Sequence, residues 1–319
     1  MTKNDTITVT ITETHARQRL DQALAQLLPD FSRAQLQLWI KSGHVLVDGK
    51  QTKPNTKLAG TEVVEIQVQS RPAEPWEAQD IPLNIVHEDD DILIINKPVG
   101  LVVHPGSGVI HSTLLNALLH HAPQLKNMPR AGIIHRLDKN TSGLLVVAKT
   151  PAAYTSLSKQ LKDRTMNREY QAIVYGPMIS GGKVDAPISR HVLDRKRMSV
   201  NEDGRHAVTH YRVAEKFPAI THLHLKLETG RTHQIRVHMF HIRHPIVGDN
   251  TYGGKIRLAK GMTEELRETI RAFNRQALHA FSLGFIHPAT KEEVSYKADL
   301  PDDMQNLIRV LRADKETKK

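Results

Sequence analysis

The sequence contains no cysteine among its 319 residues. This absence excludes disulfide bonds, thiolate nucleophiles and cysteine-based zinc or iron–sulfur sites. No apolar run approaches the roughly 18 residues that a membrane-spanning helix needs. The first stretch, MTKNDTITVTITETH, also lacks the apolar core of a signal peptide. These absences predict a cytoplasmic protein with no membrane association.

Several common catalytic motifs are missing as well. The sequence has no phosphate-binding loop of the form G-x-x-x-x-G-K-[ST], no G-x-G-x-x-G after a strand, no H-E-x-x-H and no G-x-S-x-G. Several histidines crowd one segment, but a metal site there lacks a carboxylate or a further histidine at suitable spacing. We therefore predict no metal, and expect capping, packing or RNA contacts from His233, His238, His241 and His244.

What the chain does have is positive charge. Its formal net charge is +10 at pH 7 and its pI is about 9.7, which favours a polyanionic partner such as nucleic acid. Residues 195–236 are rich in lysine, arginine and histidine, as expected of a surface that follows a phosphate backbone. A solvated basic face would give the same local pattern, but this segment and the basic N-terminal region together favour RNA.

The length and the 39% hydrophobic content predict a folded chain with two or more domains. Strand-like segments cluster and helices are few, which predicts an α+β fold with a mixed, largely antiparallel sheet. Nothing in the sequence indicates an obligate oligomer, so we expect a monomer. The expected parts are an N-terminal extension at 1–16, a small domain at 17–70, a proline-rich linker at 71–82, a larger domain at 83–312 and a flexible tail at 313–319.

The small domain shows the pattern of two helices followed by a hairpin. Leucines at helical spacing predict the first helix, and Ser32 is the expected N-cap of the second. The dipeptide Asp48–Gly49 is typical of a two-residue hairpin turn. Arg33 and Lys41 lie on the second helix, where they are candidate contacts for RNA.

Two helices of the larger domain have recognisable starts. Thr150 followed by Pro151 is typical of a capped first turn, and Thr232 is the expected N-cap of a later helix. Arg236 falls in the first turn of that later helix, where the helix dipole disfavours a cation. We therefore expect Arg236 to have a carboxylate partner.

The densest group of polar residues lies in GIIHRLDKNTSGLLVVAKTP, between two aliphatic runs. Asp138, Asn140, Thr141 and Ser142 could each cap this turn, although an ordinary turn needs only one or two such residues. Asp138 is therefore either a capping residue or a carboxylate that a nearby arginine keeps ready for nucleophilic or general-base chemistry. Because no second acid, serine–histidine pair or cysteine stands at a matching spacing, Asp138 is the natural centre of any active site.

The same stretch resembles a known catalytic family. HRLDKNTSGLLVVAKT is similar to the catalytic motif of the RluA-type pseudouridine synthases, and further blocks of that family occur in order around it. The N-terminal RLDQALAQLLPDFSRAQLQLWIKSGHVLVDGK is similar to the αL-type RNA-binding module of ribosomal proteins. The resemblance spans residues 17 to about 312, and the further blocks are INKPVGLVVHPG at 95–106, REYQAIVYG at 168–176 and ETGRTHQIRVHM at 228–239.

The resemblance implies a fold and a reaction. It implies the pseudouridine synthase fold for the larger domain, which would be the catalytic domain, and RNA binding by the smaller one. The implied activity is the cofactor-independent isomerisation of uridine in large-subunit (23S) ribosomal RNA, in the stem-loop that contacts the small subunit near the decoding site. Two alternatives stay open: a related synthase that acts on other ribosomal or transfer RNA uridines, and a non-catalytic RNA-binding factor for ribosome assembly.

The resemblance also implies roles for individual residues. Asp138 aligns with the essential aspartate, which attacks the sugar or abstracts its proton. Tyr170 aligns with the aromatic residue that stacks on the flipped base, and Arg236 with the basic partner of the catalytic carboxylate. Arg136 aligns with the residue that fills the gap left by the flipped nucleotide. The supporting residues that it implies are His135, Ile235, Asn96 and Lys97, with Arg33 and Lys41 in the small domain.

Overall fold

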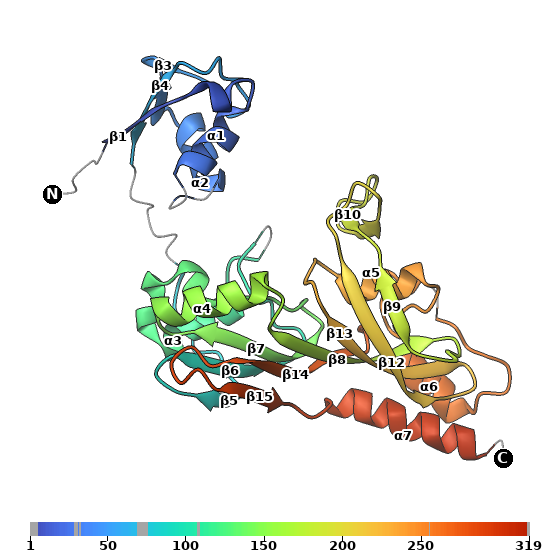
Figure 1. The fold of residues 1–319 in the computed structure, drawn as a ribbon. Coiled ribbons are helices and arrows are strands. Elements are labelled where there is room, and N and C mark those ends of the chain that lie inside the picture. The colour runs from blue at the N-terminus through green and yellow to red at the C-terminus, as the bar shows by residue number, and fades with distance from the viewer. Residues whose placement is uncertain are drawn as a thin grey trace. The chain divides into compact units, whose positions relative to one another are not determined.

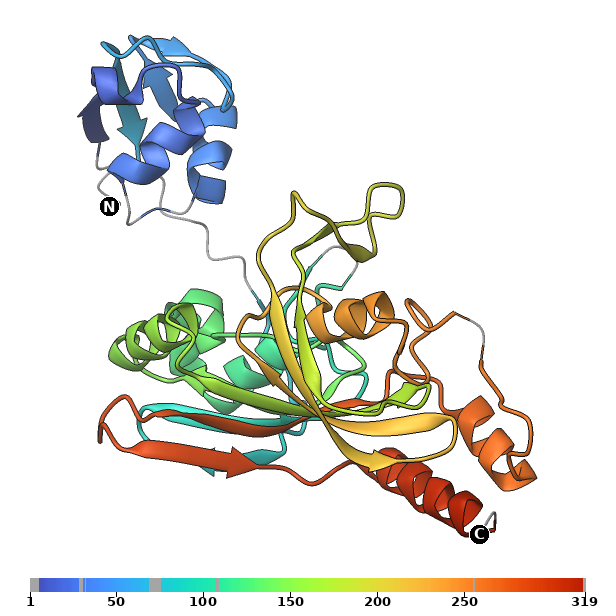
Figure 2. The same ribbon diagram turned by 45° about the vertical axis from the view of Figure 1, so that its right-hand side comes forward.

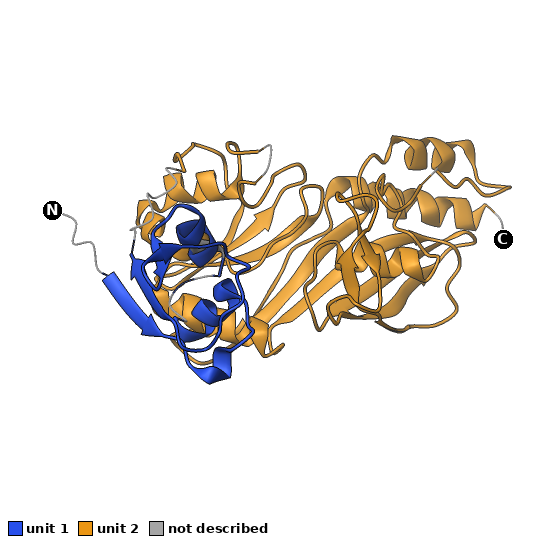
Figure 3. Ribbon diagram, turned by 90° about the horizontal axis from the view of Figure 1, so that it is seen from above, with its two compact units in different colours: residues 1–75 blue, residues 76–319 orange. Residues whose placement is uncertain are grey.

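The computed structural model divides the chain into two compact units, residues 1–75 and residues 76–319 (Figure 3). No helix among the described residues is long and apolar enough to cross a membrane. The structure describes residues 6–28, 31, 33–68, 76–106, 109–254 and 256–317.

Unit 1 packs two helices against a small antiparallel sheet with the strand order β1-β4-β2-β3. Its core is built from aliphatic residues of both helices and the sheet, around the buried Trp39. Asp48 and Gly49 have φ angles of 48° and 72°, which a tight hairpin turn requires, so the predicted turn is confirmed. The elements are β1 (Thr6–Thr10), η1 (Glu13–His15), α1 (Leu20–Leu27), α2 (Arg33–Lys41), β2 (Val45–Val47), β3 (Lys50–Gln51) and β4 (Val63–Gln67).

Two expectations for unit 1 have different outcomes. The extension predicted at 1–16 is wrong for the described part, because β1 is an edge strand that pairs with β4 from Thr6–Gln67 to Thr10–Val63. Its Ile7 and Val9 side chains pack against the core, which gives the strand its register. Ser32, the expected N-cap of α2, lies outside the described residues.

Unit 2 is built on a sheet with the order β5-β6-β7-β14-β8-β13-β12-β9, to which β15 adds by pairing with β14. All strand pairs are antiparallel except β7 with β14. The predicted α+β class with a mixed, largely antiparallel sheet is therefore confirmed. The strands are β5 (Ile85–Glu88), β6 (Ile92–Lys97), β7 (Ser142–Ala148), β8 (Asn167–Tyr175), β9 (Gly182–Asp185), β12 (Val208–Lys216), β13 (Ile220–Leu227), β14 (Leu278–Ile286) and β15 (Glu293–Lys297).

The helices of unit 2 cover both sides of this sheet. Within the unit, α4 and α5 lie on one side and α7 lies on the other (Figures 1 and 2). A separate hairpin, β10 (Ile188–Arg190) paired with β11 (Met198–Val200), projects from the sheet (Figure 1). The helices are α3 (Leu114–His121), η2 (Pro123–Asn127), η3 (Pro129–Gly132), α4 (Pro151–Lys162), α5 (Gln234–His241), α6 (Glu264–Ala272) and α7 (Asp302–Glu316).

The predicted start of α4 is confirmed. Its first residue is Pro151, and the Thr150 hydroxyl accepts a hydrogen bond from the Ala153 N–H at 3.2 Å. This is the capping geometry that the sequence indicated, with proline where its missing N–H costs nothing.

The outer limits of unit 2 differ from the expected ones at both ends. The linker was expected to continue to residue 82, but the Glu77 carbonyl accepts from Asn116 Nδ2 at 2.8 Å, which ties this strand-free segment to α3. The tail was expected from residue 313, but α7 continues to Glu316. The reason is Asp314, a buried residue whose carboxylate accepts from the Thr263 N–H at the start of α6.

Candidate active site

The polar stretch singled out in the sequence forms the loop that leads into β7, and Lys97 at the end of β6 holds this loop. Its Nζ donates to the carbonyls of Pro98, Leu101 and Lys139 at 2.7, 3.0 and 3.1 Å. Burial lowers the pKa of Lys97 to about 7, while the nearby Asp138 raises it. Three donated bonds require the ammonium form, so the charged state is the one that fastens the loop.

The hydroxyls that were expected to cap this loop do something else. Thr141 Oγ1 accepts from Gln276 Nε2 at 3.1 Å, and Ser142 Oγ lies 2.9 Å from His279 Nδ1. The first bond joins the residue before β7 to the segment before β14, and the second joins β7 to β14 itself. Gly143 permits this close pairing, because it has a φ of 113° and an added Cβ would lie 2.2 Å from a backbone oxygen of β14.

Helix α5 delivers the cation of the site. It begins at Gln234 with His233 as its N-cap, so the prediction of Thr232 is wrong. His233 has a φ of 56°, in the left-handed region, and makes no capping bond with its side chain. The Gln234 side chain instead fastens the turn before the helix: its Oε1 accepts from the Arg231 N–H at 2.9 Å and from the Thr229 hydroxyl at 2.8 Å.

Arg236 joins two carboxylates. Its Nη1 donates to Asp138 Oδ2 at 2.9 Å, while Nε and Nη2 donate to the two oxygens of Asp249 at 2.7 and 2.9 Å. Burial alone would lower the pKa of Arg236, but the hydrogen bonds and charges of Asp249 and Asp138 raise it. The predicted carboxylate partner of Arg236 is therefore observed, and a second carboxylate fixes the guanidinium from the other side.

Tyr170 and Arg168 project from the same face of β8. Both side chains are buried, and both line the cleft that Asp138 lines. Burial raises the pKa of Tyr170; Arg168 opposes this shift and Asp138 adds to it. The Tyr170 phenol is thus protonated at neutral pH, beside a cation and a carboxylate.

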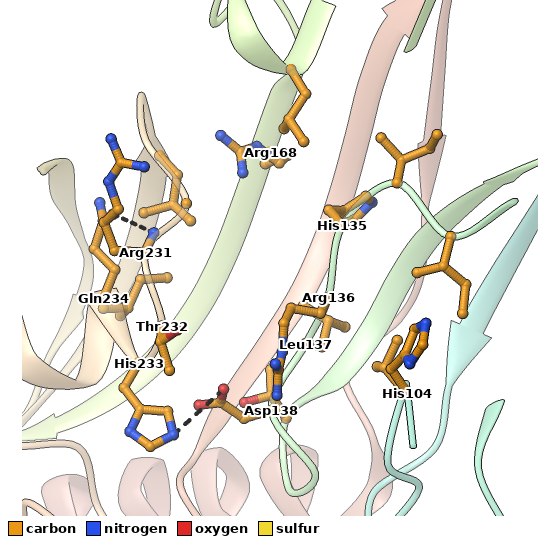
Figure 4. Close-up of a pocket in the computed structure, with 18 of the residues that line it drawn as sticks. His104, His135, Arg136, Leu137, Asp138, Arg168, Arg231, Thr232, His233 and Gln234 are labelled. Carbon is orange, nitrogen blue, oxygen red and sulfur yellow. Dashed lines mark hydrogen bonds and ion pairs between the residues drawn. The ribbon is translucent and has the colours of Figure 1, made fainter. Parts of the chain in front are cut away.

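The cleft has a volume of about 1020 Å³ and its wall is strongly basic. Asp138, Arg136, His233 and Arg236 also line a smaller hollow of about 330 Å³, so these residues separate two spaces. Figure 4 shows the His233 ring directed at Asp138, with Arg136 and Leu137 next to it. The lysine and arginine side chains of the cleft wall are Arg130, Arg136, Lys162, Arg164, Arg168, Arg231 and Arg236.

The supporting residues expected from the resemblance are distributed unevenly. His135 and Ile235 line the cleft, whereas Asn96 lines neither hollow among the described residues. Burial, with a contribution from Arg168, lowers the pKa of His135 to about 3, so this imidazole is neutral. Arg33 and Lys41 belong to α2 of unit 1 and are described with that unit.

The two histidines of α5 differ, and only His238 has a packing role. His238 is fully buried, with Nδ1 2.9 Å from the Thr209 hydroxyl and Nε2 2.9 Å from the Ala186 carbonyl. Both ring nitrogens are therefore occupied by protein atoms. His241, one turn farther along, is exposed.

Sequence reasoning missed Arg168, Asp249 and Tyr252, and it expected only capping, packing or RNA contacts from His233. Arg168 and His233 lie inside motif blocks, and the alternation of β8, which places Arg168 on the face of Tyr170, was the available signal. Asp249 and Tyr252 fall after α5, in GDNTYGG, where no spacing rule points to the site. Their contribution depends on a turn in which the Thr251 and Tyr252 N–H groups donate to Asp249 Oδ1.

Comparison with known proteins gives consistent results for both units. The family described as RNA pseudouridylate synthase matches residues 91–241, and the S4 domain matches residues 18–64. Among solved structures, human RNA pseudouridylate synthase domain containing 4 is 29% identical with a TM-score of 0.56, over 72% of this chain and 93% of that one.

Full-length relatives are more similar. Ribosomal large subunit pseudouridine synthase D of Vibrio cholerae is 55% identical over 309 residues, which cover 97% of this chain and 95% of the relative. The protein of the same name from Escherichia coli K12 is 53% identical over 314 residues, covering 98% and 96%.

Proposed function

Because the chain belongs to the RNA pseudouridylate synthase family of the RluA type, and is thus an isomerase, we propose that it converts uridine to pseudouridine in large-subunit (23S) ribosomal RNA with Asp138 as the catalytic group. The observation that carries this assignment is the placement of Asp138. Its carboxylate is held at Oδ2 by the buried Arg236 and lines a cleft of about 1020 Å³ together with Tyr170.

The reaction needs a group of this kind. The bond from ribose C1′ to uracil N1 breaks, the base rotates, and C1′ bonds to C5; C5 loses a proton and N1 gains one. Asp138 either attacks C1′ or abstracts a proton from the sugar, and a carboxylate held by Arg236 suits both steps. Atoms balance without an oxidant, an energy source or a cofactor.

The cleft also suits a base taken out of the RNA. Extruding a nucleotide costs a few kcal/mol, least in a loop, and the flipped base then stacks on an aromatic side chain. Tyr170 would be that aromatic group, with Ile235 on the wall. Arg136, an exposed residue that lines both hollows, would fill the gap left in the RNA.

Unit 1 would supply affinity and choice of site. Its match to the S4 domain and the exposed guanidiniums of Arg19 and Arg33 support binding to phosphates, to which Lys41 would contribute. The similarity to large-subunit synthases supports a target in large-subunit ribosomal RNA. Within that RNA we propose the stem-loop that contacts the small subunit near the decoding site. We further expect a cytoplasmic monomer that acts on ribosomal RNA or a subunit precursor.

Tritium release from large-subunit RNA labelled at uracil C5 tests the assignment. Wild type should release tritium, whereas Asp138→Asn should release none while binding the RNA as before, because the amide is neither nucleophile nor base. Asp80→Asn, an exposed acid outside the cleft, is the matched control and should retain full activity. Normal release by Asp138→Asn would remove Asp138 from the reaction, and a map of the modified uridines would show whether the target is in another RNA.

A further inference from the structure

His233 occupies an unusual position beside Asp138. Its backbone is left-handed at the N-cap of α5, which turns the imidazole toward the carboxylate. Nε2 lies 3.8 Å from Asp138 Oδ1, on the oxygen that Arg236 does not hold (Figure 4). Each carboxylate oxygen thus faces its own nitrogen from α5 or its cap.

The other ring nitrogen is fixed by Tyr252. The Tyr252 hydroxyl lies 2.8 Å from His233 Nδ1 and also 2.8 Å from the backbone nitrogen of Met198. A backbone N–H can only donate, so the Tyr252 oxygen accepts from Met198, and its own proton can be given to Nδ1. The Asp138 carboxylate that faces Nε2 is an acceptor, which favours this arrangement. Nδ1 is then the acceptor of the imidazole, and the ring proton resides on Nε2, the nitrogen that faces Asp138.

The surroundings keep this imidazole neutral. Burial lowers the pKa of His233, against the opposing effect of Asp138, while Arg236 adds to the lowering. A neutral ring with Nε2–H donates one hydrogen bond and carries no charge that would compete with Arg236 for the carboxylate. It can therefore orient Asp138 without weakening the ion pair.

Tyr252 is itself held firmly. It is 2% exposed, and its ring lies 5.0 Å from the Arg236 guanidinium and 5.3 Å from that of Arg197. Its N–H donates to Asp249, the second carboxylate of Arg236. Met198 and Arg197 belong to the start of β11 and the loop before it, so the hairpin β10–β11 is the anchor for the hydroxyl.

We propose that His233 is a positioning residue for Asp138: its Nε2–H faces Oδ1 at 3.8 Å and closes to a hydrogen bond when RNA occupies the cleft, while Arg236 holds Oδ2. Tyr252 fixes the required tautomer from the hairpin β10–β11. The proposal rests on the proposed function only in taking Asp138 as the catalytic group. The tautomer itself is a property of the unliganded protein.

The tautomer is measured first, by imidazole ¹⁵N spectroscopy of the full chain labelled at histidine and assigned by the spectrum of His233→Asn. Wild type should show His233 with Nε2 protonated and Nδ1 unprotonated. Tyr252→Phe should shift it toward a mixture of tautomers, and Tyr154→Phe, a substitution of the same kind on α4 outside the cleft, should leave it as in wild type. A wild-type ring protonated at Nδ1 would overturn the proposal, whether or not the chain modifies RNA.

Single-turnover kinetics then test the role. His233→Asn tolerates the left-handed backbone and keeps an acceptor near Nδ1, but it lacks Nε2–H. It should slow the chemical step about tenfold to a hundredfold with RNA affinity unchanged, the range for a lost hydrogen bond to a charged group. His233→Gln, which returns an N–H donor near the place of Nε2, should recover most of the rate.

Tyr252→Phe should lower the same rate less than His233→Asn does, since one tautomer of the mixture still presents Nε2–H to Asp138. Equal rates for wild type and His233→Asn, or failure of glutamine to outperform asparagine, would overturn the role. Inactivity of wild type on every ribosomal RNA tested would instead count against the proposed function, and the tautomer result would stand on its own.

Discussion

Both units hold carboxylates against arginines, but a different partner faces the solvent in each. In unit 1 the Asp21 side chain is fully buried, while Arg19 and Arg33, which donate to it at 3.0 and 2.8 Å, are 43% and 44% exposed. In unit 2 the Arg236 side chain is 7% exposed and that of Asp138 is 19% exposed. The accessible group is a pair of cations in unit 1 and a carboxylate in unit 2.

The difference shows that a buried aspartate paired with arginine can present either a cation or a carboxylate to the solvent. Asp21 and Asp249 are both fully buried and both fix guanidiniums. Among the described residues of unit 1, Arg19 and Arg33 contact no further carboxylate, so these cations can meet an anion such as phosphate. In unit 2 the contacts continue by one step, because the fixed Arg236 in turn fixes Asp138 for chemistry.

The largest effect on turnover should come from breaking the contacts that join Asp249, Arg236 and Asp138 in unit 2. Arg236→Lys keeps the charge but loses the planar fork that reaches Asp249 and Asp138 at once. We expect turnover to fall about a hundredfold with RNA affinity unchanged, as for removal of a preorganised charged donor. Single-turnover tritium release measures this.

Arg271→Lys, at an exposed arginine of α6 paired with Glu264, is the control and should keep wild-type turnover. A rate for Arg236→Lys close to wild type would mean that positive charge alone, and not the fork, holds Asp138.

Breaking the contacts of Asp21 with Arg19 and Arg33 should lower the free energy of unfolding of unit 1. Burial alone would raise the pKa of Asp21, but hydrogen bonds from Arg19, Gln37 and Arg33 hold this pKa at about 2, below the usual value of 3.8. This contribution to stability is complete above about pH 4 and is lost as the pH falls through about 2. Asp21→Asn should remove about 2 kcal/mol at pH 7, roughly thirtyfold in the folding equilibrium, together with the acid dependence.

Each unit has one tryptophan near its core, so the two can be followed separately. In the full chain with Trp76→Phe, Trp39 reports the unfolding of unit 1 in urea at each pH. Glu65→Gln, an exposed acid on β4, serves as control and should leave the curve unchanged. If the stability of unit 1 fell equally with pH in wild type and in Asp21→Asn, Asp21 would not be the source of that pH dependence.

The sequence allowed part of this comparison to be predicted. Asp138 was singled out by the surplus of polar residues around it, and the partner of Arg236 was expected because the helix dipole disfavours a cation there. Residue spacing alone could not identify the carboxylates, since Asp138 is 98 residues away and Asp249 acts through its turn. The family resemblance implied the pair with Asp138, but nothing in the sequence pointed to Asp249. Contacts of this range depend on the packing of β7 against β14 and of α5 against the sheet.

Two predicted boundaries, the start of α5 and the N-terminal extension, were wrong for the same reason. The N-cap of α5 is decided by the φ of His233, a backbone angle that residue type does not fix. The strand β1 exists only because β4, more than fifty residues later, pairs with it. Local patterns did succeed where the contact is local, as at Thr150 and at the Asp48–Gly49 turn.

A smaller effect on turnover should come from Tyr170, which shares the cleft with Asp138. Tyr170→Phe keeps the aromatic ring for stacking but removes the hydroxyl. Burial and the nearby Asp138 both raise the pKa of that hydroxyl. We expect RNA affinity close to wild type and turnover lowered about tenfold, a modest share of general acid–base catalysis. Tyr154→Phe again serves as the control. Loss of RNA binding would make Tyr170 a structural anchor instead.

The smallest effect should come from one exposed cation of unit 1. Arg33→Ala should raise the Kd for RNA about fivefold and reduce the slope of log affinity against log salt by about 1, because one phosphate contact is lost. Turnover at saturating RNA should stay unchanged, in contrast to Arg236→Lys. Filter binding across a salt series measures both quantities, with Lys126→Ala, at a lysine outside both hollows, as control. If Arg33→Ala slowed turnover at saturation and left the salt slope intact, the arginines of unit 1 would not be phosphate ligands, and their pairing with Asp21 would serve the fold alone.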